Sequence, residues 1–147
     1  MKYRRLEHRF MQYIPRLLEP GVLYISIEFA TAAHKCCCGC DEHIVTPLTS
    51  HDWSLTFDGE TVSLWPSIGN WNYACRSHYI IKRNRVVEAR PWRDDEITAG
   101  RQKDRLAKSE FYEVNREENK IAPSAPRKDK SAGLFSRMTR WLTNRFE

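Results

Sequence analysis

The feature that most constrains this chain is a run of cysteines. Four of its five cysteines lie at positions 36, 37, 38 and 40, and the fifth, Cys75, follows much later. Cysteines this close pair poorly with one another, because a disulfide needs separated backbones with suitable Cβ geometry. Thiolates from one short loop can instead bind a single soft metal ion, which zinc does tetrahedrally. A metal shared with Cys75 would join two distant segments in one core.

The spacing of these cysteines leaves two interpretations open. Alternate cysteines of the run share one parity and would project alike from an extended loop, whereas Cys37 and Cys40 form a Cys-x-x-Cys spacing around Gly39. We favour the alternate cysteines and the distant one as the ligands of one zinc ion: Cys36, Cys38, Cys40 and Cys75. His34 is an alternative to one of them. Four thiolates leave no open coordination position, so we expect a structural zinc rather than a catalytic one. The competing interpretations are unligated buried thiols and a redox dithiol.

Length and charge indicate one domain with a basic tail. The chain has 147 residues and a formal net charge of +5. Six basic and two acidic residues lie between Ile121 and the end, a balance of +4, so the rest is nearly neutral at +1. We therefore expect no nucleic acid partner for the main domain, whereas the tail suits a protein partner or an anionic membrane surface.

The start of the chain is charged, and no stretch approaches the roughly 20 apolar residues that cross a bilayer. Clustered cysteines without a secretory signal favour the reducing cytoplasm.

Alternating apolar residues predict a mainly β (α+β) fold, a small zinc-stapled β domain with a helical C-terminal extension. The clearest strand covers residues 22–30, and Arg83-Asn84 is the expected turn of a later hairpin. Further strands are expected at 43–46, 53–57, 61–65, 78–81 and 85–89, with a loop at 66–70. The expected divisions are an N-terminal arm or short helix at 1–19, the β domain at 20–92, a helical extension at 93–120, and a basic linker with an amphipathic tail at 121–147.

A serine and a histidine form the second constellation. Ser67 lies in a Gly/Pro-bounded segment, and His78 could act as its base once the chain is folded. Asn70 offers an amide of the type that stabilises an oxyanion. Ser77 is the rival nucleophile, although its neighbour His78 should point to the opposite face of a strand. The third member of a triad stays open among the available carboxylates, which are Asp52, Asp58 and Glu88. The competing interpretation is that these serines and histidines are structural.

Several motifs occur in order between residues 20 and 92: GVLYISIEFATAAH at 21–34, CxCGC at 36–40, VTPL at 45–48, DGETVSL at 58–64, PSIGNW at 66–71 and CxSHY at 75–79. Together they resemble a family of small bacterial zinc-binding proteins associated with bacterial ubiquitination-like (Bub-type) operons. Cys37 and Asp41 depart from it, standing where a variable small residue and a glycine are expected. The resemblance does not extend to residues 93–147.

The resemblance implies the peptidase component of such a system, which processes or removes a ubiquitin-like protein beside E1-like and E2-like partners, with a connection to phage defence. It implies Ser67 as nucleophile and His78 as base, with Asn70 and loop amides at the oxyanion. His34 would serve as an alternative base or orient His78. Tryptophans at 65 and 71 would line the groove for a glycine-containing tail. Two alternatives remain: a zinc metallopeptidase, and a non-enzymatic zinc-binding adaptor of the conjugation machinery.

Overall fold

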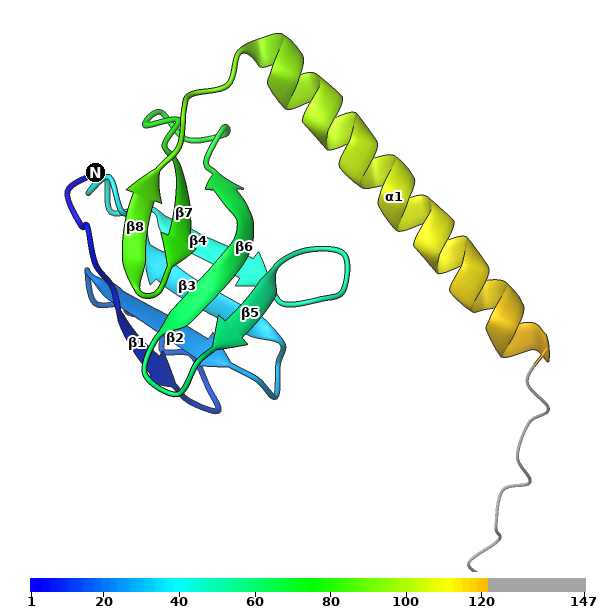
Figure 1. Cartoon of the computed structure of the whole chain (residues 1–147), viewed down its shortest axis with the longest axis horizontal. Coiled ribbons are helices and arrows are strands. Elements are labelled where there is room, and N and C mark those ends of the chain that lie inside the picture. The colour runs from blue at the N-terminus through cyan, green and yellow to red at the C-terminus, as the bar shows by residue number, and fades with distance from the viewer. Residues whose placement is uncertain (122–147) are drawn as a thin grey trace, which may run out of the picture. The chain divides into compact units, whose positions relative to one another are not determined.

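The computed structural model describes residues 1–121, which form two four-stranded sheets followed by one long helix (Figure 1). The first sheet has the order β1 (Glu7–Phe10), β2 (Val22–Ser26), β3 (Thr31–Lys35) and β4 (His43–Pro47). The second has the order β5 (Ser54–Phe57), β6 (Val62–Gly69), β7 (His78–Lys82) and β8 (Arg85–Glu88). Strands β1 and β2 pair in parallel, and the other neighbouring strands in the two sheets pair antiparallel. The mainly β fold with a C-terminal helix is therefore confirmed.

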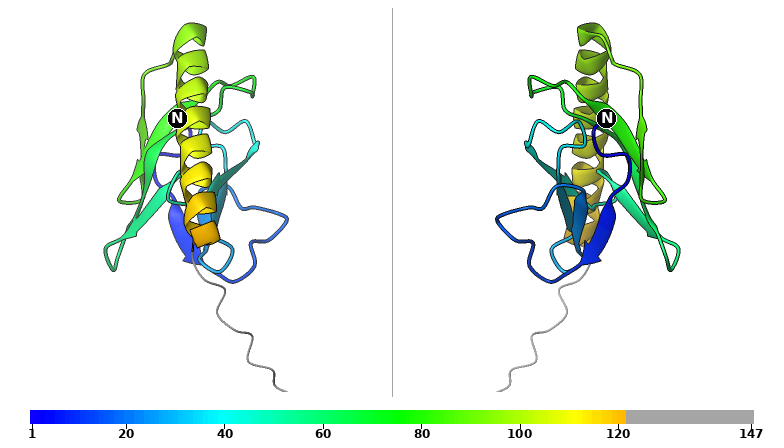
Figure 2. Two further views of the ribbon diagram at one scale, coloured as in Figure 1. Left: turned by 90° about the vertical axis from the view of Figure 1, so that its right-hand side faces the viewer. Right: turned by 90° about the vertical axis from the view of Figure 1, so that its left-hand side faces the viewer.

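The two sheets share one apolar core. Leu23 and Ile25 from the first sheet and Leu64 and Ile81 from the second are almost fully buried in the same cluster. The start of the chain connects the sheets, because Arg5 forms a bridge with Arg85 at the edge of β8. The two side views in Figure 2 show this first segment running between the sheets. Burial of alternate side chains on both sheets supplies the main driving force for this arrangement.

The strand expected at 22–30 is shorter than its alternation suggests. β2 ends at Ser26, and the chain turns through Ala30, which has a φ of 43°, before β3 begins. Ile27 and Phe29 are therefore 64% and 53% exposed rather than part of the core. The prediction was wrong here because apolar alternation continues through a tight turn without a glycine or proline to mark it.

The loop expected at 66–70 is also largely strand. β6 continues to Gly69, and Pro66 is tolerated because the strand is irregular there. Leu64 pairs with Ile81 and Ile68 with Tyr79, so three residues of β6 stand opposite one residue of β7. This β-bulge takes the backbone around Ser67 out of the regular ladder.

The N-terminal arm contains a strand, β1, instead of the short helix that we considered. The hairpin turn at Arg83-Asn84 is confirmed, since both residues have positive φ, as a two-residue type I′ turn requires. Where we expect a helical extension at 93–120, the structure has the helix α1 (Asp94–Ile121). The amphipathic tail predicted within 121–147 lies outside the described residues.

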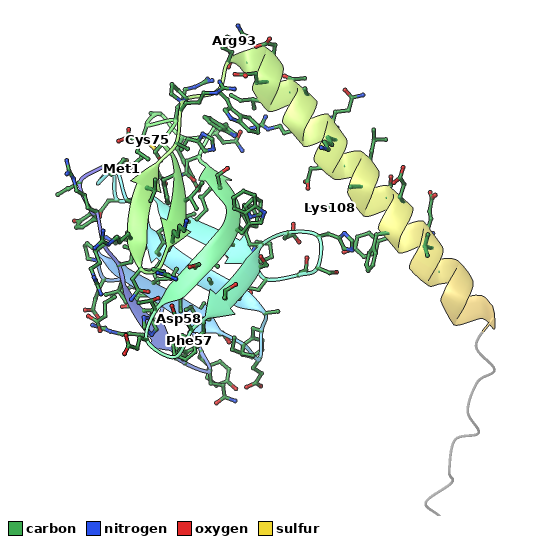
Figure 3. The ribbon with its side chains drawn as sticks, viewed as in Figure 1. Met1, Phe57, Asp58, Cys75, Arg93 and Lys108 are labelled. Atoms are coloured by element: carbon green, nitrogen blue, oxygen red, sulfur yellow. The ribbon has the colours of Figure 1, made fainter. Side chains whose placement is uncertain are left out.

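Within the described residues, Met1–Phe111 form one compact unit, and the end of α1 from Tyr112 belongs to another. The first unit includes the beginning of α1, where Lys108 forms an ion pair with Asp52 at 2.5 Å and Phe111 contacts the His51 ring. Figure 3 shows Lys108 on the side of the helix that faces the loop between β4 and β5. Within residues 1–121, α1 lacks the apolar character that a membrane-spanning helix needs.

Candidate active site and cysteine centre

Two groups of chemically active side chains meet at the start of β7. Successive residues of a strand point to opposite faces, so Ser77 and His78 face different surroundings. Ser77 lies among the cysteines, with its Oγ 3.1 Å from Cys36 Sγ. His78 faces the other way, with its Nε2 2.9 Å from Ser67 Oγ. One short segment therefore belongs to two sites.

The structure brings four cysteine sulfurs together, all within 4.8 Å of one another: Cys36, Cys38, Cys40 and Cys75. Cys36 Sγ is 3.4 Å from Cys38 Sγ and 4.0 Å from Cys75 Sγ. Four sulfurs bound tetrahedrally at about 2.3 Å from zinc would lie about 3.8 Å apart. These four positions therefore suit a single metal ion, and all five cysteines of the chain are free.

Hydrogen-bond donors around the sulfurs also suit bound thiolates. Asn70 Nδ2 donates to Ser77 Oγ at 2.8 Å and to Cys36 Sγ at 3.5 Å. Burial would raise the pKa of Cys75, but hydrogen bonds with the side chain and amide of Ser77, together with those to Cys40 and Cys38, outweigh it and lower this pKa to about 7. Cys37 lies outside the group, and burial raises the pKa of its thiol to about 12. Cys37 is therefore a buried, protonated side chain of the apolar core.

The Ser67–His78 contact follows from the register of β6 and β7. Gly69 pairs with His78, and Ser67 lies two residues before Gly69 on the same face. Side chains in such diagonal positions reach one another when one of them is long. Ser67 is half-buried and His78 only 7% exposed. The serine hydroxyl is therefore held against an imidazole that is almost fully enclosed.

The other nitrogen of His78 is held by the backbone. His78 Nδ1 lies 2.6 Å from the carbonyl oxygen of Arg90. A carbonyl oxygen only accepts hydrogen bonds, so Nδ1 carries the proton and Nε2 is left to accept the hydrogen bond of the Ser67 hydroxyl. A main-chain carbonyl thus occupies the position that a carboxylate has in a Ser-His-Asp triad.

Two tryptophans enclose the imidazole. Trp71 and Trp92 stack with their ring centroids 5.7 Å apart, and these lie 4.9 and 5.5 Å from that of His78. Gly69 makes room for the first indole, because a Cβ at that position would lie 2.3 Å from Trp71 Nε1. Their packing limits the access of water to His78 and its rotation.

The remaining predicted residues lie elsewhere. Asn70 points its amide at the cysteine centre and Ser77, not at Ser67. His34 is fully buried in the core, with Nε2 2.8 Å from the Tyr79 hydroxyl, and burial lowers its pKa to about 4. Both His78 nitrogens already have other partners, so His34 does not orient this ring.

Each carboxylate considered for a triad is engaged away from His78. Asp52 pairs with Lys108, Asp58 caps its own turn through Thr61, and Glu88 pairs with the amino group of Met1. The acceptor that the structure supplies, the Arg90 carbonyl, has no side-chain signature, so sequence patterns could not reveal it. Its only local sign is Arg90-Pro91, since proline biases the preceding residue toward extended backbone.

A cavity of about 250 Å³ adjoins both sites, and its lining includes Cys75, Ser77 and His78. Met1 and Glu88 also line it. Figure 3 shows Met1 and Cys75 near one another at this end of the sheets.

The fold and the site define a small β protein in which a four-cysteine centre lies beside an enclosed serine–histidine pair. Residues 10–89 match the family described as bacterial ubiquitination-like system serine protease (BubE). The chain belongs to this family. No curated protein and no solved structure matches the chain.

Proposed function

We propose that this chain is a serine-type peptidase that hydrolyses a peptide or isopeptide bond at the tail of a ubiquitin-like protein. One observation carries the proposal: Ser67 Oγ lies 2.9 Å from His78 Nε2, while the Arg90 carbonyl holds the opposite nitrogen. A nucleophile, its base and a group that orients the base are the three parts that this chemistry needs. The family description supplies the class of reaction and the pathway.

In the proposed reaction, His78 Nε2 takes the Ser67 proton while Oγ attacks the scissile carbonyl carbon. The tetrahedral intermediate collapses as His78 returns that proton to the leaving amine, which gives an acyl-serine. A water molecule then attacks the acyl group with His78 again as base, releasing the carboxylate and restoring Ser67. Backbone amides near the β6 bulge are the candidate donors to the oxyanion, because the strand leaves its regular ladder there. Asn70 is no longer our candidate, since its amide faces the cysteines.

Exposed aromatic surface beside Ser67 supports an extended substrate. Trp65 is 64% exposed two residues before the nucleophile, and Trp71 flanks the base. Flat rings of this kind suit the backbone of a narrow, glycine-containing tail. A ubiquitin-like protein is therefore the proposed substrate, with E1-like and E2-like proteins as the pathway partners.

We further propose that the metal held by the four cysteines is zinc. Four thiolates at tetrahedral spacing are a common structural zinc set. The ion would supply a cross-link between the Cys36–Cys40 loop and Cys75, which lies just before β7. Four sulfur ligands leave no position for water, so this arrangement supports a structural role over a metallopeptidase mechanism. Free thiols in such a centre favour a reducing compartment such as the cytoplasm.

The proposal is tested with a fluorophosphonate probe and mass spectrometry. We expect the probe to label the wild type at Ser67. The rate at which it labels the protein should fall at least about a thousandfold in Ser67→Ala and in His78→Ala. Ser54→Ala is the matched control, because this exposed serine lies on β5 opposite Trp65. Labelling at Ser77 would show that Ser77, and not Ser67, is the nucleophile.

The adaptor alternative is separated by a second assay. Incubation with a ubiquitin-like protein bearing a C-terminal extension should release the extension with wild-type protein and not with Ser67→Ala. Tight binding with equal, negligible cleavage by both proteins would favour the adaptor.

A further inference from the structure

The segment between β8 and α1 is fixed at both ends around the Arg90 carbonyl. The Ala89 amide donates to the His78 carbonyl at 2.9 Å, so β7 and β8 remain paired up to Ala89. Pro91 then restricts the backbone of Arg90 to extended conformations. This places the Arg90 carbonyl where it accepts the hydrogen bond of His78 Nδ1.

The Arg90 side chain ties the same residue to the helix. Its two terminal nitrogens contact the two oxygens of Glu96 at 2.5 and 3.0 Å. Such paired contacts fix the direction of a guanidinium as well as its distance. Glu96 also accepts a hydrogen bond from the Arg93 amide at 2.9 Å, as the third residue of a helix does in a capping box. One carboxylate therefore holds both the start of α1 and Arg90.

Trp92 completes this connection. Its indole stacks on Trp71 and contacts the edge of His78. Gly100 of α1 allows the close approach, because a Cβ there would lie 2.8 Å from Trp92 Cζ3. The first turns of the helix thus support the imidazole from two directions, through Arg90 and through Trp92. Arg90, Trp92 and Glu96 all lie beyond the residues 10–89 that match the family.

We propose that Arg90 and Glu96 are positioning residues: their ion pair holds the Arg90 carbonyl against His78 Nδ1 and so keeps Nε2 directed at Ser67. This inference rests on the proposed function, because positioning matters only if His78 is the base. When the pair is broken, the segment can move and the imidazole can take its other tautomer, in which Nε2 carries the proton. That tautomer cannot accept the serine proton.

Glu96→Gln breaks the ion pair while keeping a residue that serves equally at this capping position. We expect fluorophosphonate labelling of Ser67 to slow by roughly tenfold or more. Asp95→Asn is the matched control, since it removes the same charge from the same helical turn but contacts Arg93 instead of Arg90. The double variant Arg90→Glu/Glu96→Arg restores an ion pair in reverse and should recover at least part of the rate.

Nitrogen NMR of the His78 ring reads the proposed effect directly. The wild type should show the tautomer protonated at Nδ1, and Glu96→Gln should show a mixture, while Asp95→Asn matches the wild type. An unchanged His78 tautomer and an unchanged labelling rate in Glu96→Gln would overturn the inference. An equal fall in labelling rate in Asp95→Asn would overturn it as well. This readout does not require turnover. A wild type that shows the expected tautomer but no labelling would count against the proposed function and leave the positioning contact intact.

Discussion

The two faces of the sheet at the start of β7 are built in different ways. On the Ser77 face, four cysteine side chains converge, three of them from one loop. On the His78 face, two side chains from two strands meet, and a main-chain carbonyl from outside the sheet completes the group. The first site depends on which residues are present. The second depends on where the backbone runs, so the two should respond differently to substitution.

The largest expected effect is the loss of one sulfur ligand. Cys36→Ser should lower metal content and reduce the free energy of unfolding by about 3 kcal/mol or more, because metal binding to a folded site contributes directly to stability. Cys37→Ala is the control from the same loop, and we expect it to cost about 1 kcal/mol with metal content unchanged. Thermal unfolding and elemental analysis measure both. If both variants lost metal content and stability equally, Cys37 would be a ligand as well.

Gly69→Ala should damage the other face. The new Cβ would collide with the Trp71 indole, which then moves away from His78. We expect a fall of roughly tenfold in the labelling rate of Ser67 and a destabilisation of about 1–3 kcal/mol, with metal content unchanged.

The matched comparison is Gly100→Ala, in which the new Cβ would collide with the other tryptophan, Trp92. Alanine favours a helix by about 1 kcal/mol over glycine, so its net effect on stability should be smaller than that of Gly69→Ala. A Gly69→Ala variant with the wild-type rate would show that enclosure by Trp71 is unimportant.

Ser77→Ala tests whether the two faces are independent. Its hydroxyl contacts Cys36 and Cys75 and accepts from Asn70, so its loss should weaken metal binding by roughly tenfold, as removal of a hydrogen-bonding partner of a ligand does. Competition with a zinc chelator measures this affinity. With the metal bound, labelling of Ser67 should stay within about twofold of the wild type. A selective loss of labelling would show that the two faces are coupled through β7.

The smallest expected effect is a titration. The hydrogen bond from Arg90, followed by that from the Arg93 amide, lowers the pKa of Glu96 from 4.5 to about 2. Because the folded state depresses this pKa, the contribution of Glu96 to stability is present above pH 4.5 and disappears as the pH falls toward 2. Carboxyl carbon NMR should show no Glu96 step near pH 4.5, and the step should return toward that value in Arg90→Ala. A step near 4.5 in the wild type would contradict the contact.

The sequence could predict the cysteine centre because it consists of side chains with one unusual chemistry and a shared parity. Ser67 and His78 could be named from the Gly/Pro-bounded segment and from the family resemblance. The expected alternation of a strand at 78–81 also separated Ser77 from His78. The Arg90 carbonyl could not be predicted, because every residue has one. The contacts of the Asn70 amide with Cys36 and Ser77 could not be predicted, because they depend on the irregular path of β6. Pro66 predicts a loop there, whereas the structure has a bulged strand. Backbone irregularities of this kind leave no periodic signal.

The position of Arg90, one residue beyond the part that matches the family, has a practical consequence for engineering. A fragment cut after residue 89 would retain Ser67, His78 and every cysteine, and with them the whole region that matches the family. It would nevertheless lack the Arg90 carbonyl, which lies 2.6 Å from His78 Nδ1. Any fusion partner or purification tag joined at the C-terminal side therefore belongs after the first turns of α1.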